Sequence, residues 1–130
     1  ILADDDHGLM RLWPEPPGFS DLWRAYIRSY DRNGTDPFIG RRLVALLHAA
    51  GALPRRNTLL FFGGCAGMES FDVLAANMIG VAATARNLIV EHDLMEAPSF
   101  DAAIEHFHAW SKRPDAALWY AMSWAEALRP

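Results

Sequence analysis

Residues 36–51 read DPFIGRRLVALLHAAG, and this stretch carries the most specific local signals in the chain. Asp36 followed by Pro37 is typical of a helix start, because aspartate caps the first turn and proline fits its first position. Gly51 can end the helix in the left-handed conformation. Apolar residues recur between them at helical spacing. The stretch therefore predicts a helix whose apolar side consists of Ile39, Leu43, Leu46, Leu47 and Ala50.

Two adjacent arginines, Arg41 and Arg42, lie near the start of this helix. Positive charge is unfavourable there, because the helix dipole is itself positive at that end. We therefore expect a compensating carboxylate, supplied by Asp36 or by the acidic segment at residues 4–6. Contact between Arg41 and an anionic substrate is the alternative interpretation.

Helical and strand patterns flank this stretch on both sides. Residues 19–34, FSDLWRAYIRSYDRNG, repeat apolar residues at helical spacing and predict a helix that Ser20 caps and Gly34 ends. Residues 55–63 contain the apolar run TLLFF, which predicts a strand buried on both faces or nearly so. Residues 1–3 predict the end of another buried strand, which we expect to begin upstream of Ile1.

The later part of the chain predicts a helical region at about residues 66–113. Its first helix starts near Ser70 and runs to about Leu94, and its second starts near Ser99. Residues 117–124, ALWYAMSW, predict a final strand. Strands that alternate with helices indicate an α/β fold, here with about three strands. We expect one domain, residues 1–130, that forms the C-terminal part of a doubly wound sheet.

Composition excludes several classes of protein. The net charge is −4 and no basic stripe is present, so nucleic acid is not an expected partner. Cys65 is the single cysteine, which rules out a disulfide within the chain and fits a reducing cytoplasm. The most apolar stretch, residues 73–90, is interrupted by Asn77 and Arg86, so we expect no membrane span. We predict a cytoplasmic protein.

At DHG, PEPPG, DPFIGRRL, LLHAAG and the final WAEALRP, the sequence resembles a known family. It resembles the C-terminal half of a class I S-adenosylmethionine-dependent methyltransferase, of the subgroup that acts on small molecules and quinone-like acceptors. The resemblance implies a Rossmann-like sheet whose fifth strand ends at ADDDHG. Residues 55–63 and 117–125 would be the sixth and seventh strands, the seventh antiparallel between the fifth and sixth. Residues 66–113 would be a helical insertion.

The resemblance also implies a division of function. In this family the N-terminal half carries the glycine-rich loop that binds the cofactor, and no G-x-G-x-G run occurs in residues 1–130. We therefore expect the parent protein to use S-adenosylmethionine and this chain alone to bind none. The chain would be the acceptor-side half, inactive in isolation, and would bind a small-molecule acceptor.

The acidic segment at residues 4–6 and His7 follow the first predicted strand at its carboxyl end, where open α/β sheets bind ligands. We expect Asp6 or His7 to orient the acceptor or to take its proton during methyl transfer. A solvated turn is the alternative. A metal site is not expected, because neighbouring residues of a strand point to opposite sides.

Further residues could contact the acceptor. Arg41 is a candidate through its charge, and Trp13 and Trp124 are candidates for stacking, with core packing as the alternative. A second hypothesis makes the chain a non-catalytic module that binds an apolar ligand or a partner. The exposed edges of a short sheet and the small residues at 80–85 both favour self-association, so a homodimer is expected.

Overall fold

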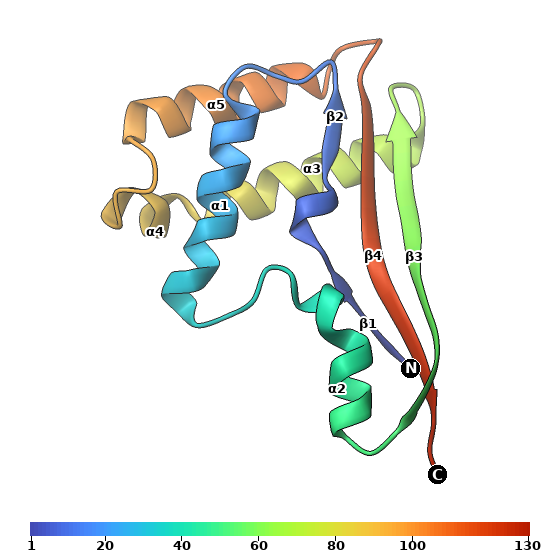
Figure 1. Cartoon of the computed structure of the whole chain (residues 1–130). Coiled ribbons are helices and arrows are strands. Elements are labelled where there is room, and N and C mark those ends of the chain that lie inside the picture. The colour runs from blue at the N-terminus through green and yellow to red at the C-terminus, as the bar shows by residue number, and fades with distance from the viewer. The chain divides into compact units, whose positions relative to one another are not determined.

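The computed structural model describes all 130 residues as an α/β fold with five α-helices and a four-stranded antiparallel sheet (Figure 1). The α/β class was predicted, but the sheet has four strands rather than about three. The strand that was not predicted comprises residues 11–13. It directly precedes the proline-rich segment, where the prolines indicated irregular structure. The elements are β1 (Leu2–Asp5), η1 (His7–Leu9), β2 (Arg11–Trp13), α1 (Phe19–Asn33), η2 (Ile39–Arg42), α2 (Leu43–Ala49), β3 (Leu53–Cys65), α3 (Glu69–Thr84), α4 (Arg86–Glu91), α5 (Ala97–Trp110) and β4 (Ala117–Leu128), where η denotes a short 3-10 helix.

The last strand of the chain is the common neighbour of the other three. β1 pairs antiparallel with β4, so that Leu2 lies opposite Ala125 and Asp5 lies opposite Met122. β3 and β2 also pair with β4. In Figure 1, β3 lies on the opposite side of β4 from β1. The sheet order around β4 is therefore β1, β4, β3.

The chain forms two compact units. The first unit contains β1, η1, η2, α2 and most of β3 and β4. The second contains β2 and the helices α1, α3, α4 and α5. Their residues are 1–10, 36–62 and 119–130 for the first unit, and 11–35 and 63–118 for the second.

In the first unit, η2 and α2 pack against β1. Gly40 makes this close packing possible, because a Cβ atom there would lie 2.8 Å from the Asp5 carbonyl oxygen and 2.8 Å from Ser123 Oγ. The predicted helix at residues 36–51 therefore begins as a 3-10 turn and becomes α-helical at Leu43. Leu43 is the one buried residue of α2.

The strands of the first unit are more exposed than predicted. Phe61 of β3 is 77% exposed, and Leu59, Leu60 and Phe62 are exposed as well. Leu2 of β1 is also exposed. The prediction that these strands are buried is wrong, because an apolar run predicts a strand but not the layers that would cover it.

In the second unit, α1, α3, α4 and α5 pack around an aromatic core. The rings of Phe19 and Phe107 meet edge to face with centroids 5.1 Å apart, and Phe71 lies 5.5 Å from Trp110. Such edge-to-face geometry is favourable between aromatic quadrupoles. The predicted apolar side of α1 is confirmed, since Phe19, Leu22, Trp23 and Tyr26 are buried.

Two details of the helical predictions are wrong. Gly18 rather than Ser20 precedes the first turn of α1, and Ser20 Oγ instead donates to Glu15. The long helix expected to reach Leu94 ends at Thr84, and α4 follows as a separate helix. No helix of the chain combines the length and the apolar character needed to cross a bilayer.

Candidate functional site

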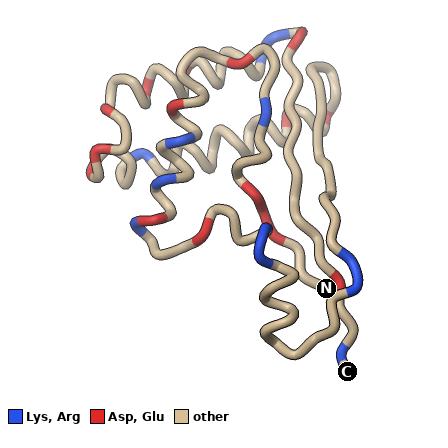
Figure 2. The backbone as a smooth tube through the Cα atoms, viewed as in Figure 1, with Lys and Arg blue, Asp and Glu red and all other residues tan.

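Asp6 and Arg41 form a bidentate ion pair in the first unit. Arg41 Nε donates to Asp6 Oδ2 at 2.6 Å, and Arg41 Nη2 donates to Asp6 Oδ1 at 2.9 Å. Figure 2 shows the acidic end of β1 beside the basic start of the α2 segment. Arg42 in turn lies 3.4 Å from Asp36. The prediction that the two arginines have carboxylate partners is confirmed.

The Asp6 carboxylate is buried and its hydrogen-bonding capacity is well used. Besides Arg41, the backbone N–H of Gly8 donates to Oδ1 at 2.9 Å, which caps η1. Burial acts to raise the pKa of Asp6, but the hydrogen bonds from Arg41 and Gly8 outweigh it and bring the pKa below its usual value of 3.8. Asp6 is therefore a permanent anion near neutral pH, suited to holding Arg41 in place rather than to accepting a proton.

His7 is the second member of the predicted site, and its partner comes from β4. The Tyr120 hydroxyl and His7 Nδ1 lie 3.2 Å apart in a hydrogen bond. The backbone N–H of His7 donates to the Pro37 carbonyl at 3.1 Å, which ties the segment to the loop before η2. Sequence reasoning missed Tyr120, because 113 positions separate it from His7 and no local pattern joins them.

The environment of His7 favours the neutral imidazole. Burial lowers the pKa of His7 below its usual 6.5, and the charges of Asp5, Asp6 and Asp4 offset this only in part. In the tautomer that donates from Nδ1 to Tyr120, the lone pair lies on Nε2, where a base needs it. His7 can therefore accept a proton near neutral pH, with its ring oriented by Tyr120.

A cavity of about 430 Å³ lies beside the ion pair, on the part of the unit where η2 approaches β3 and β4. Asp6, Arg41 and Ser123 line it, and Leu9 and Leu59 supply apolar walls. The Arg41 side chain is 58% exposed, so part of its guanidinium faces solvent. This arrangement can hold a small molecule that combines an apolar body with a hydrogen-bond acceptor.

The two candidate tryptophans lie in different surroundings. Trp124 is on β4 opposite Ala3 of β1, and its indole N–H donates to Glu126 at 2.8 Å. The alternation of β4 is interrupted at Tyr120 and Ala121, which are both buried, and Trp124 faces the side of the strand opposite to Ser123. Trp13 belongs to β2 in the second unit and is largely exposed. Stacking of substrate on either ring remains a prediction.

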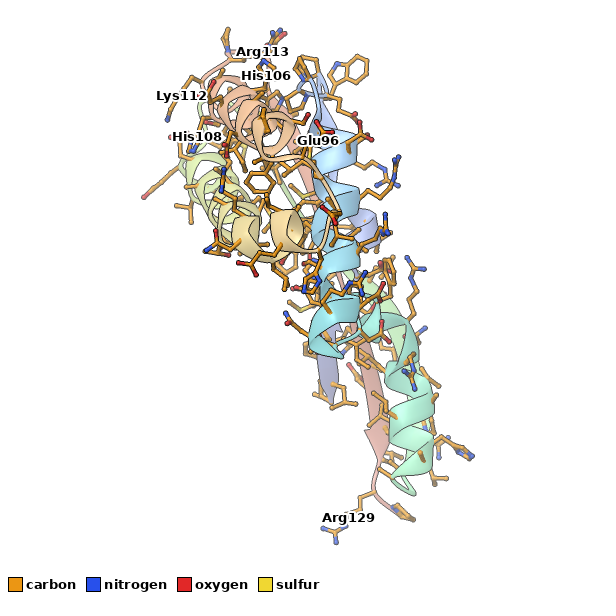
Figure 3. All side chains as sticks on the ribbon, turned by 90° about the vertical axis from the view of Figure 1, so that its left-hand side faces the viewer. Glu96, His106, His108, Lys112, Arg113 and Arg129 are labelled. Atoms are coloured by element: carbon orange, nitrogen blue, oxygen red, sulfur yellow. The ribbon has the colours of Figure 1, made fainter.

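A smaller cavity, of about 200 Å³, lies within the second unit between residues 14–17 and the C-terminal part of α5. Figure 3 labels His106 and Arg113, which both line it. His106 Nδ1 lies 3.2 Å from the Pro17 carbonyl oxygen. Trp110 also lines the cavity, and its buried indole N–H has no hydrogen-bond partner. An unpaired buried donor of this kind costs about 1–3 kcal/mol.

No three His, Cys, Asp or Glu side chains gather in a way that could hold a metal ion. The chain matches no model of a known protein family and no curated protein.

Proposed function

We propose that this chain is the acceptor-side half of an S-adenosylmethionine-dependent methyltransferase that acts on a small molecule. The observation that carries the proposal is the order β1, β4, β3 around an antiparallel β4. The family that the sequence resembles has this order in its fifth, seventh and sixth strands. Five helices in an α/β arrangement are compatible with it.

In this proposal His7 is the general base and Tyr120 is its positioning residue. S-adenosylmethionine, held by residues outside this chain, supplies an activated methyl group. His7 Nε2 would take the proton of an acceptor hydroxyl as that oxygen accepts the methyl group. The lowered pKa of His7 supports this role, because the base must be neutral before the reaction.

Asp6 and Arg41 have a different part in the proposal. Their ion pair fixes the turn that presents His7, and the exposed part of Arg41 can bind an acceptor oxygen. Trp124 directly follows Ser123 on β4, so its side chain faces away from the cavity that Ser123 lines, and it is given no part in binding the acceptor. No residue of this chain is assigned to the cofactor.

The test uses the protein encoded by the complete gene. We expect transfer of labelled methyl from S-adenosylmethionine to a panel of phenols and quinols, and a loss of about 100-fold or more in kcat for His7→Ala. His92→Ala is the matched control, since His92 is an exposed histidine at the end of α4. Equal activity in both variants would remove His7 from the mechanism.

The isolated chain offers a second test of the same proposal. Titration calorimetry with S-adenosylmethionine should give no heat of binding, because the chain has no G-x-G-x-G run. Micromolar binding would contradict the assignment of the cofactor site to other residues. A gene that starts close to Ile1, with no glycine-loop unit upstream, would contradict the proposal as a whole.

A further inference from the structure

β3 is a long edge strand with one unpaired side. It runs from Leu53 to Cys65 and pairs with β4 alone, so the backbone N–H and C=O groups of its other edge meet no strand of this chain. Figure 1 shows β3 at the margin of the sheet. Such an edge is a template for pairing with another strand.

The usual protection of an edge strand is confined to the N-terminal end of β3, at Pro54, Arg55 and Arg56. Proteins that remain monomeric commonly place charge or proline on such edges. Residues 57–65, NTLLFFGGC, contain neither. Instead Leu59 and Phe61 are exposed on one face of the strand, and Leu60 and Phe62 are exposed on the other. Both faces therefore gain by burial against an apolar neighbour.

We propose that this edge is a homodimer interface in which β3 pairs antiparallel with β3 of a second copy, centred on Leu60. The two copies would be related by a two-fold axis perpendicular to the sheet. Because opposite residues of an antiparallel pair point to the same face, one central residue must then lie opposite the same residue of the other copy. This register sets Leu59 opposite the partner's Phe61 and Thr58 opposite the partner's Phe62. The inference rests on the sheet edge and does not depend on the proposed function.

The charges on β3 favour the antiparallel over the parallel orientation of two copies. Arg55 and Arg56 are the only charged residues of the strand, and both lie toward its N-terminal end. In the antiparallel register they lie opposite the partner's Cys65 and the partner's Gly64, so no like charges meet. Parallel pairing would set Arg55 beside the partner's Arg55, which is unfavourable. The dimer also closes on itself, because each copy has used its β3 edge.

The first test measures mass against concentration by sedimentation. The wild-type chain should reach twice its monomer mass of 14.5 kDa as concentration rises. Phe61→Lys should weaken the dimer by about tenfold or more, because symmetry introduces the charge twice. Val73→Lys is the matched control, since Val73 is 65% exposed on α3, and it should dimerise like the wild type. A wild-type chain that stays monomeric, or equal effects of both lysines, would overturn the proposal.

The second test reads the register through the single cysteine. In Arg55→Cys, the new thiol should form a disulfide with the partner's Cys65 under mild oxidation and give a covalent dimer. Residues 55 and 65 of one strand are about 33 Å apart at 3.3 Å per residue, so no disulfide can form within one chain. Arg56→Cys, with its side chain on the opposite face, should not cross-link. Equal cross-linking of the two variants, or none in Arg55→Cys, would refute this pairing.

Discussion

Arg41 donates two hydrogen bonds to Asp6, a residue 35 positions earlier in the chain. The pair joins the turn after β1 to the start of the α2 segment, and the carboxylate also accepts the Gly8 N–H. One buried anion therefore holds two backbone segments together at the candidate site. This makes Asp6 the residue whose loss should most disturb the local structure.

We expect Asp6→Asn to lower the free energy of unfolding by about 1–3 kcal/mol, because a charged hydrogen-bond acceptor is lost while Arg41 keeps its charge. Asp4→Asn is the matched control. Asp4 is exposed and its side chain accepts only the N–H of Asp5. Its effect should stay below about 0.5 kcal/mol. Urea denaturation of both variants measures the difference, and equal losses would contradict the role given to the ion pair.

The same carboxylate predicts how stability varies in acid. The pKa of Asp6 in the folded chain lies below its usual 3.8, so the folded state holds the proton more weakly than the unfolded state. The stabilisation is therefore complete above pH 3.8 and is lost as the pH falls through the folded-state pKa. The stability gap between the wild type and Asp6→Asn should narrow in that window. A gap that does not change with pH would count against this assignment.

His7 gives a separate prediction above that range. Because burial lowers its pKa below 6.5, folding should favour the neutral imidazole. The resulting stabilisation is present above pH 6.5 and is lost as the pH falls through the folded-state pKa. An NMR titration of the His7 ring should have its midpoint below 6.5. A midpoint above 6.5 would mean that the nearby carboxylates dominate instead.

Gly40 and Gly80 form a matched pair of substitutions. A Cβ at Gly40 would lie 2.8 Å from the Asp5 oxygen and from Ser123 Oγ, so Gly40→Ala should destabilise the chain by about 1–3 kcal/mol. Gly80 lies inside α3 with no atom within 4 Å of such a Cβ. Gly80→Ala should therefore stabilise by about 0.5–1 kcal/mol. Thermal denaturation measures whether each variant is less or more stable than the wild type. A Gly40→Ala variant as stable as the wild type would contradict the tight packing of η2.

The sequence predicted helices and strands well where the apolar spacing agreed with the residues that typically begin or end such an element. Helix α1 was expected at residues 19–34 and spans Phe19–Asn33, because its apolar spacing and Gly34 both mark it. The strand pattern at 55–63 was also placed correctly, although β3 is longer at both ends. The break after Thr84 was not predicted, since neither glycine nor proline marks it.

Burial and long-range pairing could not be predicted in the same way. The run TLLFF indicates a strand whether or not another layer covers it, so the exposure of Phe61 was not foreseen. Charge alone predicted that the partner of Arg41 is either Asp36 or one of the aspartates at residues 4–6. The fold is needed to identify this partner as Asp6. The contact of His7 with Tyr120 depends on where β4 lies in the sheet, so no pattern of neighbouring residues in the sequence predicts it.

The central place of β4 has a consequence for synthesis on the ribosome. β1 and β3 both pair with β4, which follows both of them in the sequence. Neither can complete its hydrogen-bonded ladder until residues 117–128 have left the exit tunnel. During that interval the apolar TLLFF segment is unpaired, and this makes the nascent chain a candidate client for chaperones that shield extended apolar segments.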